Sequence, residues 1–302
     1  MEKDNQSTQE INSQAQNPLG IAPVGGLIPK FAIPAIISML VSAMYNIVDQ
    51  IFIGQGVGML GNAATNVAFP VTTIATALAL LLGIGGASNY NLEMGAGQEK
   101  KASGIAGTAL SSLVISGLIL AVIALVFLKP LLTLFGATTD VMPYAVDYTG
   151  ITALGLPFYI LSVGGNHVVR ADRSPTYSMT CIMIGAIINT ILDPVFIFVF
   201  GWGIKGAAWA TVIGQVVSGV LVIVYFWKFR NMYLTGAMLK PKMPYLKAII
   251  SLGLASCINQ IAMAIVQIVL NNILRHYGAD SVYGSDIPIA CVGVISLSLI
   301  HI

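Results

Sequence analysis

Charged residues are scarce in this chain. Of its 302 residues, 9% are Asp, Glu, Lys or Arg, whereas 56% are hydrophobic. A soluble domain carries roughly 25% charged residues, so this chain has too little charge to cover a globular surface. Apolar stretches of about 20 residues, each long enough to cross a bilayer as a helix, recur along the sequence. We therefore expect an all-α polytopic membrane protein that is surrounded by the lipid bilayer.

Cysteine and net charge are also low. The three cysteines, Cys181, Cys257 and Cys291, lie in apolar segments at unrelated spacings. We interpret them as packing residues, which predicts neither disulfides nor a metal set. The net charge of +2 gives no reason to expect nucleic acid as a partner. No cofactor is expected, and we expect the protein to be monomeric.

The apolar runs predict the positions of the membrane helices. They cover residues 28–53, 62–87, 103–127, 141–165, 176–200, 204–228 and 248–274, and a further run starts near residue 287. With the N-terminus inside, eleven Lys and Arg residues fall on the inner side and three on the outer side. This asymmetry predicts a cytoplasmic N-terminus. Residues 1–27, which are polar at first and carry no targeting pattern, are expected to be a cytoplasmic tail.

A basic segment divides the helices into two groups. Residues 229–247 form the longest basic connector, and residues 28–228 before it hold six predicted helices. Residues 248–296 after it resemble the first helix weakly, in a register that sets Asn271 against Asp49. Both compared helices run from inside to outside, so the pattern predicts a parallel repeat. We expect a six-helix N-lobe, a cytoplasmic connector, and helices 7 and 8 of a second lobe.

The last residues end inside an apolar run. Residues 297–302, LSLIHI, have no cap and no polar exit. We expect a truncated reading frame in which these six residues are an artefactual end.

Two acidic residues lie well inside apolar helices. A carboxylate at membrane depth costs about 2.5–3.5 kcal/mol on insertion scales, which favours a functional role for Asp49 and Asp193. At 1.5 Å per residue, their predicted depths below the outer ends of their helices differ by only about 3 Å. The alternative is that each acid stays protonated and only bonds across helices.

Other polar residues fall at the same depth. Thr211 is level with the two acids, Asn189 lies one turn from Asp193, and Tyr45 lies one turn from Asp49. The five side chains would line one cavity if the first, fifth and sixth helices were neighbours. Carboxylate, amide and hydroxyl oxygens suit a hard cation, and a buried carboxyl group can also bind a proton. The predicted H⁺ or Na⁺ coupling site consists of Asp49, Asn189, Asp193 and Thr211.

Four prolines interrupt helical runs: Pro34, Pro70, Pro157 and Pro194. Each removes a backbone hydrogen bond and permits a bend. A kink at Pro194 would change the exposure of the adjacent Asp193. For Pro70 and Pro157 we favour prolines that packing merely tolerates.

Two further patterns have structural interpretations. The stretch GIGGAS (Gly83–Ser88) follows no strand and is not followed by Gly-Lys-Ser/Thr, so it indicates close helix packing and not a phosphate loop. Trp202, Tyr144 and Tyr148 lie at an outer boundary and are expected to be interface anchors.

The sequence resembles the multidrug and toxin extrusion (MATE) transporters, particularly the bacterial branch. The resemblance runs from about Pro29 to Ser296 and rests on AIPAIISMLVSAMYNIVDQIFIGQGVG, NTILDPVFIFVFGWGIKGAAWATVIGQ and RADRSP. It implies two six-helix lobes and alternating access in the bacterial cytoplasmic (inner) membrane. It further implies antiport, in which H⁺ or Na⁺ is exchanged for small lipophilic, often cationic, drugs or toxins.

The resemblance also assigns roles to residues. Tyr45 matches an aromatic residue before the first acid, and Pro34 matches the proline at which helix 1 is thought to bend. Some members carry a carboxylate in helix 7, where this chain has Gln260, Gln267 and Asn271. This favours coupling through the N-lobe and leaves Gln260 and Asn271 as candidates for the substrate cavity or its gate. The coupling residues implied by the resemblance are Asp49, Asn189, Asp193 and Thr211.

Two other functions are weighed against drug export. A lipid-linked oligosaccharide flippase would favour a more cationic cavity, and no basic residue lies in the middle of a predicted helix. An intramembrane aspartyl protease needs a Tyr-Asp pair and a Gly-x-Gly-Asp motif. Here the acids are preceded by Val48 and Leu192. We therefore expect a transporter and not an enzyme.

Overall fold

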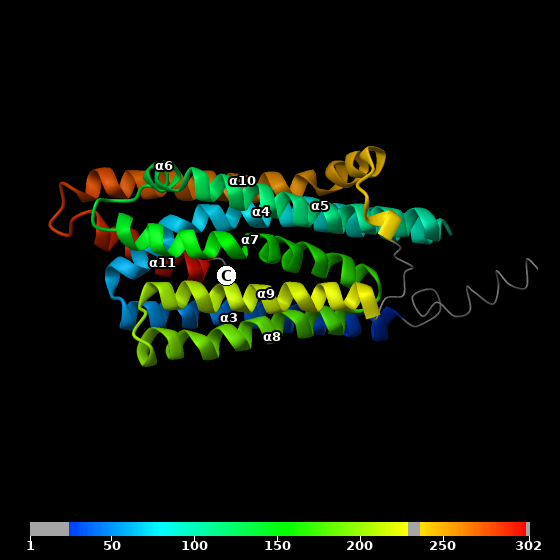
Figure 1. The fold of residues 1–302 in the computed structure, drawn as a ribbon, viewed down its shortest axis with the longest axis horizontal. Helices are drawn as coiled ribbons and strands as arrows, with labels where there is room; N and C mark the ends of the chain where they lie inside the picture. Colours follow the sequence, from blue (N-terminus) through cyan, green and yellow to red (C-terminus); the bar gives the residue numbers. More distant parts are fainter. Residues whose placement is uncertain (1–23, 229–235, 300–302) are drawn as a thin grey trace, which may run out of the picture.

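The computed structural model describes residues 24–228 and 236–299, and over these ranges it contains helices and no strand (Figure 1). Two short elements lie between successive α-helices. They are the π-helix η1 (Val195–Val199) and the 3₁₀-helix η2 (Gly236–Leu239). The α-helices are α3 (Val24–Gly56), α4 (Met59–Gly95), α5 (Glu99–Val126), α6 (Leu128–Leu134), α7 (Met142–Ala171), α8 (Pro175–Pro194), α9 (Ile204–Lys228), α10 (Met243–Gly278) and α11 (Asp286–Leu299).

The predicted membrane spans are confirmed. Among the described residues, seven helices are long and apolar enough to cross a bilayer, and a shorter apolar helix starts at Asp286. Several helices run past their predicted ends, as α4 does to Gly95 and α10 does by starting at Met243. Backbone hydrogen bonding continues into polar flanking turns, which hydropathy alone does not detect. The all-α membrane fold class is confirmed.

Some predictions fall on residues without a described structure. These are the tail up to residue 23, residues 229–235 of the basic connector, and residues 300–302 at the end. The division into two lobes stays a prediction, because α10 and α11 both pack directly on α4.

Helix α4 lies at the centre of the bundle and packs against α5, α7, α10 and α11 (Figure 1). A Cβ atom on Gly83 would lie 2.5 Å from the Cα of Gly164 in α7, and one on Gly86 would lie 2.6 Å from the Cβ of Ala109 in α5. A Cβ on Gly85 would collide with the backbone oxygen of Ile249 in α10. Each glycine of GIGGAS thus faces a different helix, which confirms the packing interpretation.

Helix α3 packs mainly against α8, and it makes few contacts with α4, the next helix in the chain. Helix α8 also packs along α9, so the first, fifth and sixth membrane helices are adjacent (Figure 1). This confirms the arrangement that a shared polar cavity requires. Large apolar side chains of α3, including Met39 and Leu40, are exposed, as expected of a helix that faces lipid.

The four prolines differ in their effect on the backbone. Helices α3, α4 and α7 continue through Pro34, Pro70 and Pro157. At Pro194, in contrast, α8 ends and the π-helix η1 follows. A π-helical turn is rare and occurs frequently at functional sites. The predicted backbone distortion next to Asp193 is therefore present.

Candidate functional site

A pair of buried carboxyl groups joins α3 to α8. Asp49 is 7% exposed and Asp193 is 0% exposed, and the two side chains interact directly with each other. The Oδ1 atom of Asp49 is buried and has no hydrogen-bond partner among the described residues. Two carboxylates this close together repel each other unless a cation or a proton lies with them. The pair thus has the chemistry of a cation site.

The amide of Asn189 connects this pair to α9. With its oxygen and nitrogen assigned by hydrogen bonding, Nδ2 donates to Asp193 Oδ2 at 3.2 Å, and Oδ1 accepts from the backbone N–H of Thr211 at 3.2 Å. Asn189 and Asp193 lie one turn apart on one face of α8, which is why both reach the same place. The structure therefore brings together Asp49, Asn189, Asp193 and Thr211.

Tyrosines complete the surroundings of the acids. Tyr45 on α3 interacts electrostatically with both carboxyl groups and with Tyr159 on α7. The hydroxyl of Tyr159 in turn forms a 2.9 Å hydrogen bond with the hydroxyl of Thr76 on α4. Tyr148, also on α7, interacts with Thr211 and with both acids. The prediction that Tyr148 is an interface anchor was wrong. Its depth below the outer end of its helix matches that of Thr211, and this was the signal that could have placed it in the site.

Gln50 is a second residue that the sequence did not single out. Thr65 on α4 donates a hydrogen bond to Gln50 Oε1 at 3.0 Å. This bond fixes α3 to α4 one residue from Asp49. Gln50 therefore positions the backbone that carries the first acid.

The remaining predicted residues lie elsewhere. Pro34 is half-buried on α3, about 22 Å from Asp49 at 1.5 Å per residue. Gln260 is half-buried and Asn271 is fully buried, both on α10, which packs on α4, α5 and α11. The structure thus groups neither Gln260 nor Asn271 with the acid pair.

Asn271 belongs to a separate cluster of buried amides. Asn66 of α4 donates to Asn271 Oδ1 at 3.2 Å and to the carbonyl oxygen of Ile289 in α11 at 2.8 Å. Gln267 donates to Asn66 Oδ1 at 2.8 Å, and Asn271 donates to the carbonyl oxygen of Phe135 at 3.2 Å. These bonds connect α4, α10, α11 and the segment after α6, so the cluster holds the helices together.

Replacing Asn271 tests this structural role. Asn271→Ala removes the hydrogen bonds of Asn271 with Asn66 and with the carbonyl oxygen of Phe135, and a buried polar group left without its partner costs about 1–3 kcal/mol. We expect a lower melting temperature of the purified protein, measured by tryptophan fluorescence in detergent. Gln260→Ala, a half-buried position on the same helix, serves as the control and is expected to change the melting temperature little. Equal effects of the two substitutions would contradict the assignment.

The geometry agrees with a comparison against protein families. The pattern of the MatE family matches residues 34–195, the segment that carries Asp49, Asn189 and Asp193. The chain belongs to the MATE family. The family resemblance predicted from the sequence is thus confirmed.

The chain is similar to multidrug export proteins of two staphylococci. Multidrug export protein MepA of Staphylococcus aureus is 29% identical over 258 residues, covering 85% of this chain and 57% of MepA. MepA of Staphylococcus haemolyticus is 29% identical over 249 residues, covering 82% of this chain and 55% of that protein. This MATE chain therefore spans a little over half the length of these relatives.

Solved structures show the same fold. The MATE multidrug transporter DinF-BH, solved as a complex, matches with a TM-score of 0.85 and 32% identity, over 93% of this chain and 61% of that one. An inward-facing multidrug resistance MATE transporter of the MOP superfamily matches with a TM-score of 0.76 and 27% identity, over 86% and 60%. Both matches thus cover more than four fifths of this chain and about three fifths of the solved one.

Proposed function

We propose that this MATE protein exports lipophilic cationic drugs or toxins across the bacterial cytoplasmic membrane in exchange for H⁺ or Na⁺. The observation that carries the proposal is the buried pair Asp49 and Asp193, with an unpartnered oxygen on Asp49. Two negatively charged carboxylates inside a membrane helix bundle are costly unless they bind a cation or a proton. The relatives named as multidrug exporters support a drug or toxin as the substrate.

The proposed coupling acts through the contact between α3 and α8. Without a bound cation, repulsion between Asp49 and Asp193 opposes that contact. A bound Na⁺ or proton removes the repulsion and favours the state in which the helices are together. A ligand shifts a conformational equilibrium by its difference in affinity for the two states. The π-helix after Asp193 gives α8 a deformable point at the place where this shift begins.

The residues fit either cation. Na⁺ would find oxygen ligands on Asp49, Asp193 and Thr211, with the Asn189 oxygen as a fourth after reorientation. A proton would need only the two carboxyl groups, which can share it. We propose that the inward flow of one of these two cations drives the outward export of the drug or toxin. We also propose that the N-terminus lies in the cytoplasm.

Cells that lack their own drug exporters test the proposal. We expect the complete native gene to speed the loss of ethidium fluorescence compared with cells that carry the empty vector. If H⁺ is the coupling cation, collapsing the proton gradient should stop this efflux and removing external Na⁺ should not. If Na⁺ is the coupling cation, the reverse is expected. Efflux that survives both treatments would contradict cation-coupled export.

A further inference from the structure

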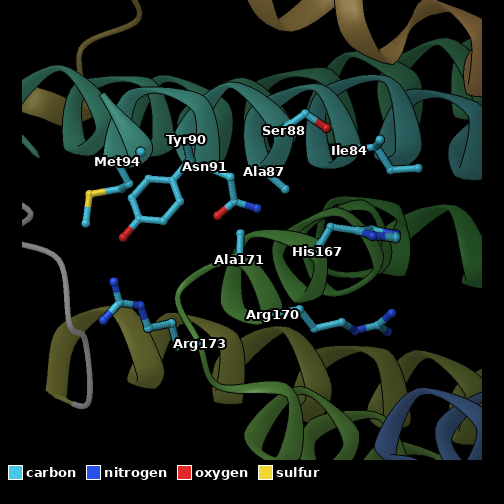
Figure 2. A pocket seen from close by; sticks show the side chains of 11 residues that line it. Ile84, Ala87, Ser88, Tyr90, Asn91, Met94, His167, Arg170, Ala171 and Arg173 are labelled. Atoms are coloured by element: carbon cyan, nitrogen blue, oxygen red, sulfur yellow. The ribbon is translucent and has the colours of Figure 1, made fainter. Parts of the chain in front are cut away.

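A cavity lies at the end of the bundle opposite the acid pair. It has a volume of about 610 Å³ and lies between α4 and α7, close to the points where these helices end (Figure 2). Ligand sites typically measure about 300–1,000 Å³, so the cavity is large enough for a small ligand. The sequence predicts that this end of the bundle faces the cytoplasm.

The shape of the cavity follows from the helix packing. Gly83 and Gly164 allow α4 and α7 to touch in the middle of the bundle. Nearer the helix ends, the cavity is lined by residues of both helices. Ile84 and Ala87 give the cavity an apolar part, and Ser88 and Asn91 add polar groups from α4. The cavity therefore suits a molecule with both an apolar and a polar portion.

The charge lining the cavity has one sign. Arg170 and Arg173 carry this charge, His167 lies beside them, and none of the described lining residues is acidic (Figure 2). The carboxylate nearest in sequence is that of Asp172, which is buried. It accepts hydrogen bonds from Tyr90 at 2.8 Å and from Tyr225 at 2.7 Å. Both arginines thus line the cavity and bring positive charge to it, and their guanidinium groups point in opposite directions (Figure 2).

The two arginines are held in different ways. The Nε of Arg170 donates to Ser178 Oγ on α8 at 3.0 Å, and this bond fixes the side chain. A guanidinium group has five N–H donors in all. Arg173 has φ of +62°, and it is the one described residue other than glycine with a positive φ. Such a conformation is costly for a side-chain-bearing residue and often marks a functional position.

We propose that this pocket binds a phosphate group, carried by the head group of an anionic phospholipid. Arginine binds phosphate through paired N–H donors, and basic pockets between membrane helices at the cytoplasmic side bind anionic lipid head groups. The apolar part of the cavity, at Ile84 and Ala87, favours a phospholipid over free phosphate. The site is separate from the acid pair and does not depend on the identity of the coupling ion.

Binding to the purified chain in a neutral detergent tests this site. The probes are dioctanoyl phosphatidylglycerol, dioctanoyl phosphatidylcholine and inorganic phosphate, with binding measured by native mass spectrometry. We expect the phosphatidylglycerol to bind at least ten-fold more tightly than the phosphatidylcholine. Inorganic phosphate that displaces the lipid at similar concentrations would support the phosphate site and identify free phosphate as its ligand.

Substitutions at the pocket make the test specific. Arg173→Gln is expected to weaken phosphatidylglycerol binding at least five-fold, and Arg173→Lys to restore part of it. Ala87→Leu fills the apolar part without changing charge and is expected to weaken the lipid more than inorganic phosphate. Lys100→Gln and Lys240→Gln remove the same charge from exposed positions that do not line the pocket, and are expected to leave binding unchanged.

Two results would overturn the proposal. One is equal binding of the anionic and zwitterionic lipids. The other is a loss in Lys100→Gln as large as that in Arg173→Gln, because this would mean that only the overall charge attracts the lipid. Melting curves of each variant show whether it is folded when its binding is measured.

Discussion

Asp49→Asn and Asp193→Asn are each expected to lower drug resistance to the level of cells without the protein. Asparagine has nearly the same size as aspartate but carries no charge and does not exchange a proton. The substitution therefore removes the cation site and leaves the packing of α3 on α8 intact. Removing one of two buried charged partners commonly has a large effect, because the pair acts as a unit. The minimum inhibitory concentration of ethidium measures the result.

A third carboxylate provides the matched control for this prediction. The side chain of Asp147 is 43% exposed, and its Oδ2 lies 3.3 Å from Lys205 Nζ. An exposed ion pair of this kind contributes about 0–1 kcal/mol, so Asp147→Asn is expected to keep full resistance. The double variant Asp49→Asn/Asp193→Asn should be no worse than either single variant, because both acids act in one site. Single variants that keep part of the resistance, with a further loss in the double variant, would mean that the acids act separately.

Gly85→Ala is expected to destabilise the protein strongly. The added Cβ would collide with the backbone oxygen of Ile249, and on the opposite helix a Cβ on Gly253 would collide with the backbone of Leu81. Backbone atoms cannot turn aside as a flexible side chain can, so α4 and α10 must separate. Overpacking typically costs about 1–3 kcal/mol and occasionally more, and we expect the upper end of that range at this crossing.

Gly95→Ala is the control for the packing prediction. Gly95 lies near the end of the same helix, and a Cβ there would meet no atom within 4 Å. Alanine in a helix is more favourable than glycine by roughly 0.5–1 kcal/mol, so this variant should melt at the same temperature or slightly higher. Melting of the purified variants in detergent gives the comparison. A Gly85→Ala protein as stable as the wild type would contradict the close crossing of α4 and α10.

The helices could be predicted from the sequence because the membrane requires long apolar runs. Their ends could not, since polar turns continue α4 and α10 beyond the apolar part. The depth of Asp49 and Asp193 followed from the helical rise alone. Their contact also depends on which helices are neighbours, and this is decided by packing between distant segments.

The residues missed in the site and in the buried amide cluster make contacts between helices that no local pattern brings together. Tyr148 is on α7, a helix that no sequence pattern places beside the acids, and an outer tyrosine is typical of membrane interfaces. The amides Asn66 and Gln267 carry no charge, so hydropathy alone gives them little weight. Their hydrogen bonds join residues that are 201 positions apart in sequence, and no local pattern reports such a contact.

We propose that Asp49 and Asp193 together bind the coupling cation. The most direct test is ethidium transport into proteoliposomes that hold the protein from the complete native gene, driven by a proton gradient or a sodium gradient applied singly. We expect one gradient to drive transport in the wild type and neither to drive it in Asp49→Asn or Asp193→Asn. Gradient-driven transport in both variants at the wild-type rate would contradict the claim and place the coupling site elsewhere.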